Sequence, residues 1–270
     1  MCAQANTGTV LGRILESRRA EVELRKKVLP ETALKYGVQA ASPLRDFPGA
    51  LTRPGINVIA ELKAASPSRG VLREPFYPVA LAESLASSGA TALSVLTEPA
   101  FFQGSLKNLR EARQSVKLPV LRKDFIFDPW QVWEARANDA DSFLLIVLTL
   151  SDAQLKELLA LGRELGMEPL VEVHTREELD RALAAEAQII GVNNRNLQTL
   201  EVRTETSFEL VDHIPENCIA VSESGICTHG ELTKLRAAGF DAFLIGTCLM
   251  LSPDPATVLA ELLGARAQGK

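Results

Sequence analysis

The sequence has few of the side chains that bind metals or build disulfide frameworks. Its 270 residues include only three histidines and four cysteines, and the cysteines (Cys2, Cys218, Cys227 and Cys248) form no CxxC pair. Structural zinc sites bring cysteine and histidine ligands together at short spacings, so we expect no zinc site. The N-terminus also lacks an apolar export signal, which predicts a cytoplasmic protein with reduced thiols.

An excess of positive charge is lacking as well. Lysine and arginine total 29 against 34 aspartate and glutamate residues, a formal net charge of −5. A basic surface for nucleic acid is therefore not expected, and an anionic ligand would need a local site. No apolar run approaches the roughly 18 residues of a membrane-spanning helix, so we expect no membrane contact either.

What the sequence does contain is a short apolar run that recurs eight times. Between Asn57 and Ala242 the runs begin every (242 − 57)/7, or about 26, residues, enough for a strand and one crossover helix. The runs are Asn57–Lys63, Ala92–Thr97, Val120–Phe125, Ser142–Val147, Pro169–His174, Ile189–Arg195, Ile219–Ser224 and Ala242–Thr247. Their apolar residues alternate little with polar ones, which is typical of parallel strands covered on both faces.

The segments between the runs have helical signals. Ser151–Leu165 opens with cap candidates, Thr175–Ala184 places Glu178 three residues after Thr175 as in a capping box, and His229–Ala238 stops at a glycine. Eight βα units favour an α/β fold of the (β/α)₈ TIM-barrel type. A doubly wound open sheet is the alternative, but it usually has fewer strands, and no G-x-G-x-x-G motif follows the first run.

The part before the first strand has a different pattern. Val10–Val28 is an amphipathic helix candidate, and three prolines punctuate the residues that follow it. We interpret residues 1–55 as an N-terminal helical extension that packs on the barrel, within one domain of residues 1–270.

Charged side chains gather at one end of alternate predicted strands. Near its C-terminal end, strand one carries Glu61 and Lys63, strand three carries Lys123, strand five carries Glu172 and strand seven carries Glu223. Barrel active sites lie at this end, and odd strands point side chains into common layers. We therefore expect these five groups to converge in one cavity, where they would shift each other's pKa values and supply an acid and a base.

A second signal follows the last two predicted strands. Ser224-Gly225 comes after strand seven and Gly246-Thr247 after strand eight. Glycines let the backbone approach a ligand, and loops after strands seven and eight are the recurrent phosphate site of this architecture. This pattern predicts a phosphorylated substrate.

Several of these segments resemble indole-3-glycerol phosphate synthase, and the similarity runs in order along the barrel. The segments that carry it are AELKAASPSRG (60–70), LRKDF (121–125), LVEVH (170–174), IGVNNRNL (190–197), SESGI (222–226) and LIGTCLM (244–250). The resemblance implies a (β/α)₈ barrel with an N-terminal extension that uses no metal or organic cofactor. It also implies an enzyme of tryptophan biosynthesis, which closes the indole ring of 1-(2-carboxyphenylamino)-1-deoxyribulose 5-phosphate and releases carbon dioxide and water.

The resemblance also implies catalytic roles. Lys123 matches the lysine near the substrate carbonyl, Glu172 the general acid/base, and Lys63 the second catalytic lysine. Glu61 and Glu223 match glutamates that keep the lysines charged and position substrate. How the two lysines divide the acid roles stays open.

The remaining matches are substrate contacts. Asn193 and Arg195 match contacts at the end of strand six, and Phe102 and Phe125 match the walls of an anthranilate pocket. The residues matching the phosphate-binding region are Ser66, Gly225, Gly246 and Thr247, and Ser224 is a further expected substrate contact.

Two other functions fit a phosphate-binding barrel. One is a related enzyme such as phosphoribosylanthranilate isomerase, which needs a single acid/base pair and leaves two lysines and three glutamates unexplained. The other is a catalytically silent barrel that only binds sugar phosphates.

Surface composition does not distinguish a monomer from a dimer, and we expect a monomer.

Overall fold

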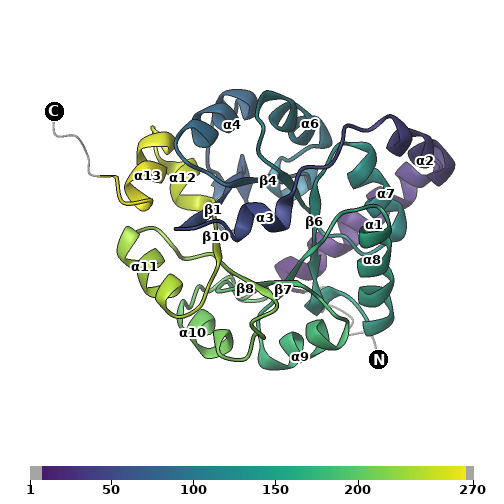
Figure 1. Cartoon of the computed structure of the whole chain (residues 1–270). Helices are drawn as coiled ribbons and strands as arrows, with labels where there is room; N and C mark the ends of the chain where they lie inside the picture. Colours follow the sequence, from purple (N-terminus) through teal and green to yellow (C-terminus); the bar gives the residue numbers. More distant parts are fainter. Residues whose placement is uncertain (1–7, 266–270) are drawn as a thin grey trace.

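The barrel predicted from the eight runs is present in a computed structural model, which describes residues 8–265. Its eight parallel strands close in the order β1-β10-β9-β8-β7-β6-β5-β4 (Figure 1). They are β1 Asn57–Leu62, β4 Ala92–Leu96, β5 Val120–Lys123, β6 Ser142–Ile146, β7 Leu170–Val173, β8 Ile189–Asn193, β9 Ile219–Glu223 and β10 Ala242–Ile245. Each begins at the predicted residue or one later and ends one or two residues earlier, so the doubly wound alternative is wrong.

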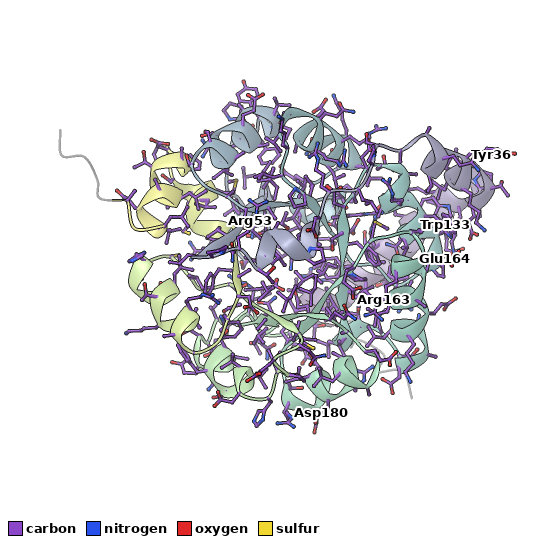
Figure 2. The ribbon with its side chains drawn as sticks, viewed as in Figure 1. Tyr36, Arg53, Trp133, Arg163, Glu164 and Asp180 are labelled. Atoms are coloured by element: carbon purple, nitrogen blue, oxygen red, sulfur yellow. The ribbon has the colours of Figure 1, made fainter. Side chains whose placement is uncertain are left out.

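A ring of helices surrounds the strands (Figure 1). It consists of α4 Pro78–Ser87, α6 Leu106–Ser115, α7 Pro129–Ala137, α8 Asp152–Glu164, α9 Arg176–Ala184, α10 Glu205–Val211, α11 His229–Ala237 and α13 Pro255–Leu262. Exposed side chains such as Asp180 on α9 and Tyr36 on the outlying α2 stand at the rim of the molecule (Figure 2). None of the helices between residues 8 and 265 combines the length and apolar composition that a membrane crossing needs.

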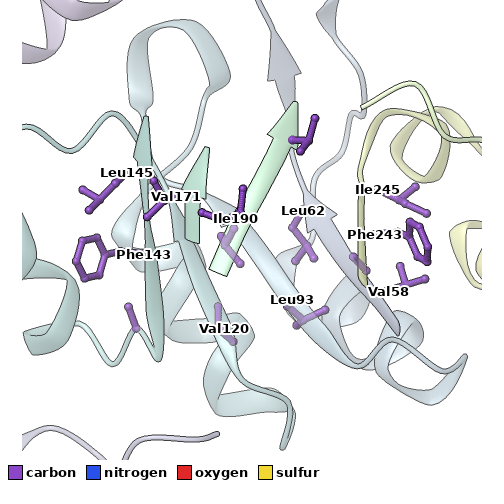
Figure 3. Close-up of a cluster of buried hydrophobic side chains, with 14 of the residues drawn as sticks. Val58, Leu62, Leu93, Val120, Phe143, Leu145, Val171, Ile190, Phe243 and Ile245 are labelled. Carbon is purple, nitrogen blue, oxygen red and sulfur yellow. The ribbon is translucent and has the colours of Figure 1, made fainter. Parts of the chain in front are cut away.

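Alternation along each strand divides the core in two. Val58 and Leu62 of β1 belong to the outer cluster between strands and helices, together with residues such as Phe143, Ile190 and Phe243 (Figure 3). Ile59, between Val58 and Leu62, belongs to the inner cluster instead. Successive side chains of a strand point to opposite faces, so Glu61, two residues after Ile59, also points into the barrel.

From residue 8 onward, three helices precede the barrel, α1 Val10–Val28, α2 Glu31–Ala40 and α3 Phe47–Leu51. Helix α3 lies over the centre of the strand ring at its N-terminal end, where the Asn57 side chain donates to the carbonyls of Leu51 and Asp241 (Figure 1). Residues 1–7 of the expected extension, including Cys2, lie outside the described residues, and the single-domain division stays a prediction.

The sequence patterns did not reveal the short elements that follow some of the strands. They are the hairpin of β2 Ala65–Ser66 and β3 Gly70–Val71, the helices α5 Pro99–Phe102 and α12 Thr247–Leu251, and the 3₁₀ turn η1 Val147–Thr149. All of them follow the C-terminal ends of barrel strands. Since α3 closes the opposite end, this end is the one open to a ligand.

Candidate active site

A cavity of about 300 Å³ lies at the C-terminal end of the barrel. All the predicted site residues except Ser66 line it: Glu61, Lys63, Phe102, Lys123, Phe125, Glu172, Asn193, Arg195, Glu223, Ser224, Gly225, Gly246 and Thr247. Ser66 is buried in the β2–β3 hairpin, and Arg69 of the same hairpin lines the cavity instead. The role of Ser66 in phosphate binding stays a prediction.

Lys123 is at the centre of the charged groups. Its Nζ donates to Glu172 Oε2 at 2.9 Å and to Glu223 Oε2 at 2.6 Å, so residues from β5, β7 and β9 meet at one atom. All three side chains are at least 88 % shielded from solvent. Charged groups are rarely buried unless paired, and this lysine is paired twice. The predicted convergence of the odd strands is confirmed for these three residues.

Lys63 forms a second pair in the cavity. Its Nζ donates to Glu61 Oε1 at 2.5 Å, which agrees with both side chains pointing to the same side of the first strand. The carboxylate of Glu61 also lies near enough to Lys123 to favour its charged form. Two ammonium groups are thus held in one cavity by three carboxylates.

A glycine on β8 and one directly after β10 make room for these carboxylates. A Cβ atom at Gly191 of β8 would lie 2.2 Å from Glu223 Oε1, and one at Gly246 would lie 2.4 Å from Glu61 Oε1. Glu61 is 4 % exposed and Glu223 1 % exposed, so neither can easily move away. Gly191 was not identified from the sequence, although a glycine inside a strand often marks a close approach of another group.

Glu172 and Glu223 have opposite pKa shifts although both contact Lys123. Burial alone would raise the pKa of Glu172, but Lys123 and His174 outweigh it and hold that pKa well below its ordinary value. For Glu223, burial together with the charge of Glu172 raises the pKa to about 7 in spite of Lys123. Burial disfavours charge on Lys123, yet the surrounding carboxylates raise its pKa above the ordinary value. At neutral pH, therefore, the site contains an ionised Glu172, a cationic Lys123 and a Glu223 that can hold a proton.

His174, which directly follows β7, is part of this network. Its Nε2 lies 3.4 Å from Glu172 Oε1, and its Nδ1 lies 3.0 Å from Glu178 Oε2. Thr175 caps α9 as predicted, but Glu178 binds the backbone and ring of His174 rather than completing a capping box. Burial would lower the pKa of His174, and the two carboxylates raise it to about 10. The imidazole is thus a cation that keeps Glu172 ionised.

One wall of the cavity is aromatic. The rings of Phe102, on α5, and Phe125, directly after β5, have centroids 6.1 Å apart and planes inclined by 42°. Leu144, Ile146 and Leu244 also line the cavity. A flat apolar group of substrate can pack here beside Lys123.

Polar backbone and cationic groups line the rest of the cavity. Ser224 and Gly225 have positive φ angles of 68° and 78°, and a Cβ at Gly225 would lie 2.7 Å from Val202 Cγ1. Arg195 donates from its guanidinium to the Leu200 carbonyl. Burial, and then the charge of Arg69, lower the pKa of Arg195. An anion between the two guanidiniums would relieve this unfavourable proximity.

Asn193 is held by its neighbour in the chain. Its Oδ1 accepts from the backbone N–H of Arg195 at 2.9 Å, which leaves its amide nitrogen available to a ligand. Within residues 8–265, no group of three or more histidine, cysteine, aspartate or glutamate side chains is placed to hold a metal ion.

The fold and cavity define a (β/α)₈-barrel enzyme with paired lysines and glutamates beside a glycine-rich loop region. Solved structures similar to this chain share the fold alone. A 3-hexulose-6-phosphate synthase matches 78 % of this chain and 100 % of its own at a TM-score of 0.60 and 11 % identity. An N-acetylmannosamine-6-phosphate 2-epimerase from Clostridium perfringens matches 77 % of this chain and 93 % of its own at a TM-score of 0.60 and 16 % identity.

Sequence relatives define the family. The family model of indole-3-glycerol phosphate synthase matches residues 11–262. The indole-3-glycerol phosphate synthase of Roseiflexus sp. (strain RS-1) is 49 % identical over 266 residues, covering 95 % of this chain and 98 % of the relative. That of Rhodococcus jostii (strain RHA1) is 47 % identical over 259 residues, covering 96 % of each chain. This chain belongs to the indole-3-glycerol phosphate synthase family.

Proposed function

We propose that this chain is a decarboxylating lyase that converts 1-(2-carboxyphenylamino)-1-deoxyribulose 5-phosphate to indole-3-glycerol phosphate in tryptophan biosynthesis. The family match supports this activity and disfavours the isomerase alternative. In the reaction the aryl carbon that carries the carboxylate attacks the ribulose carbonyl. Carbon dioxide leaves, aromaticity is restored, and water departs.

Substrate binding uses opposite sides of the cavity. The phosphate binds near Ser224, Gly225, Gly246 and Thr247, and the anthranilate ring packs on the aromatic wall. With both ends fixed, the ribulose carbonyl lies over the charged groups between them. Arg195, which lines the same cavity, neutralises part of the negative charge of the substrate.

Lys123 is the general acid of ring closure. As the aryl carbon attacks, the carbonyl oxygen becomes an alkoxide, and the ammonium both stabilises and protonates it. Its hydrogen bonds to Glu172 and Glu223 aim the Nζ atom into the cavity. A Glu223 carboxyl with a pKa of about 7 is placed to return a proton to the amine.

Dehydration needs a proton for the departing hydroxyl and a base for the substrate proton that is lost. Glu172 suits the base because Lys123 and His174 keep its pKa low and its carboxylate ionised. Lys63 is the second cation in the cavity, and Glu61 holds it in place. It assists the departure of the hydroxyl, and Asn193 orients the substrate beside it.

The observation that carries this proposal is the contact of one buried lysine with two glutamates from separate strands. It is tested by mixing purified protein with the carboxyphenylamino substrate and following indole fluorescence. We expect fluorescence to rise with time. Binding of the substrate without any rise would support the silent sugar-phosphate-binding barrel instead.

The phosphate site has its own test. Inorganic phosphate should compete with substrate, raising KM without changing kcat, because it occupies the loops after β9 and β10. No competition even at high phosphate would contradict the assignment of Ser224, Gly225, Gly246 and Thr247.

We further propose that the enzyme works in the cytoplasm as a monomer without a cofactor.

A further inference from the structure

Two cysteines meet beside the proposed phosphate site. Cys227 follows β9 in the Gly225-containing loop, and Cys248 is in α12, directly after Gly246 and Thr247. Both line the active-site cavity. The Cys248 thiol donates to the carbonyl oxygen of Ile226, the residue before Cys227, at 3.5 Å, so the two cysteines are neighbours in space. One thiol of this pair thus lies in each of the two segments proposed to bind phosphate.

The environment of Cys227 favours reaction with oxidants, whereas the neighbouring Cys227 and burial raise the pKa of Cys248. Cys227 is exposed, and Cys248 is half-buried. The neighbouring Cys248 side chain lowers the pKa of Cys227 to about 7, with Arg69 acting in the same direction and burial and Glu231 opposing it. A thiolate is the reactive form of cysteine, and one that is accessible beside a second thiol resembles a redox-sensor site. Cys218 differs, because burial raises its pKa and its thiol contacts the Ala187 carbonyl.

We propose that Cys227 and Cys248 are an oxidisable dithiol whose disulfide blocks the phosphate site. With hydrogen peroxide as oxidant, the Cys227 thiolate attacks one peroxide oxygen, giving a sulfenic acid and releasing hydroxide. Cys248 then attacks the Cys227 sulfur, forming the S–S bond and releasing water. Two thiols lose two electrons, and one peroxide becomes two waters.

The disulfide would act on substrate binding. It ties the loop after β9 to α12 and draws the two sulfur atoms to the covalent distance of about 2 Å. In the disulfide form, the backbone at Gly225 and Gly246 is held in a position that does not fit a phosphate. This consequence rests on the proposed function, whereas formation of the disulfide does not.

The experiment uses the full chain with Cys2→Ser and Cys218→Ser, so that Cys227 and Cys248 are the remaining thiols. After hydrogen peroxide treatment, intact mass should fall by about 2 Da and a peptide linking the two cysteines should appear. We expect KM to rise about tenfold or more, the inhibition constant of inorganic phosphate to rise in parallel, and dithiothreitol to reverse both. The matched control adds Cys227→Ser, and its KM should be the same before and after peroxide.

The two parts of the proposal fail in different ways. Peroxide treatment that leaves both thiols free, or oxidises Cys227 without linking it to Cys248, would overturn the dithiol pair. A quantitative disulfide with unchanged KM and unchanged phosphate inhibition would overturn its effect on the phosphate site. Failure of the proposed function is seen separately, as absence of indole fluorescence from the reduced protein.

Discussion

At the scale of single residues, the surroundings of each carboxylate determine its charge. Glu172 and Glu223 share the ammonium of Lys123, yet their pKa values move in opposite directions. The difference comes from His174, which favours the charged form of Glu172, and from the charge of Glu172 itself, which disfavours charge on Glu223. Two identical side chains can therefore take the roles of base and proton reservoir in one cavity.

The first prediction concerns His174. Its pKa is raised to about 10 in the folded protein, so its stabilising contribution is fully present below its unfolded pKa of about 6.5 and is lost as pH rises through 10. The substitution His174→Asn should lower the free energy of unfolding more at pH 6.5 than at pH 9.5, with a difference of roughly 1–3 kcal/mol. Urea unfolding of both proteins at the two pH values measures this difference.

His213→Asn is the matched control, since it replaces an exposed histidine. A His174→Asn variant whose stability loss is equal at both pH values would show that the imidazole is neutral. In the same variant, the decrease of kcat on the acid side should begin at a higher pH, because Glu172 has lost a cation that keeps it ionised.

Residue type and spacing predicted part of this site. Glu61, Lys63, Lys123, Glu172 and Glu223 could be found because they lie at the ends of odd strands, where alternation fixes their direction. The role of His174 could not, because it depends on Glu178 of α9. No local pattern shows which carboxylate a histidine will contact across a strand–helix connection.

At the scale of elements, helix α1 is joined to strand β5 by buried charge. Arg18, which is 1 % exposed, donates to both oxygens of Asp124 at 3.0 and 2.7 Å. Asp124 also accepts from Arg122 and Thr97. Because Asp124 stands between Lys123 and Phe125, the first helix holds the end of the strand that carries the proposed general acid, Lys123.

The second prediction follows from this contact. Arg18→Met should lower the unfolding free energy by about 2–4 kcal/mol, because removing one partner leaves part of a buried charge uncompensated. Lys26→Met on the same helix is the control, since the ion pair of Lys26 with Asp128 is partly exposed and worth about 0–1 kcal/mol. Equal effects of the two substitutions on denaturant midpoints would contradict a special role for Arg18.

The third prediction concerns strand β8. Gly191→Ala should reduce kcat/KM about a hundredfold, because its methyl group would displace the Glu223 carboxylate and with it Lys123. Gly230→Ala is the matched control, since a Cβ there meets nothing within 4 Å. Steady-state kinetics of both variants, with circular dichroism to verify folding, make the comparison. Normal activity of Gly191→Ala would mean that the position of Glu223 is not critical.

The regular elements were easier to predict than the irregular ones. Strands and long helices are indicated by runs and periodicity, as in Val10–Val28, which is helical over the expected residues. The β2–β3 hairpin has two residues in each strand, too few for any periodic signal. Its tertiary surroundings determine that Arg69, and not Ser66, lines the cavity.

At the scale of the whole molecule, closure of the barrel creates the site. Lys123, Glu172 and Glu223 are separated by 49 and 51 residues in the sequence, yet they meet because β5, β7 and β9 are alternate strands of one closed sheet. Recognising eight repeats was therefore enough to predict the convergence, but not the hydrogen-bond partners within it.

The fourth prediction concerns assembly. One chain forms a cavity lined by nearly all the predicted site residues, and we therefore expect activity without a second copy. Light scattering during size exclusion should give a mass near the 29.3 kDa of one chain. A mass of twice that value at working concentrations would contradict the monomer.

The central claim is that Lys123 is the general acid, and its replacement tests it most directly. Lys123→Ala should lower kcat by about 10²–10⁴-fold while inorganic phosphate still binds and the far-ultraviolet circular dichroism is unchanged. Lys107→Ala, at a side chain 74 % exposed on α6, should turn over like the unmodified protein. Near-normal kcat in folded Lys123→Ala, measured by indole fluorescence, would contradict the account.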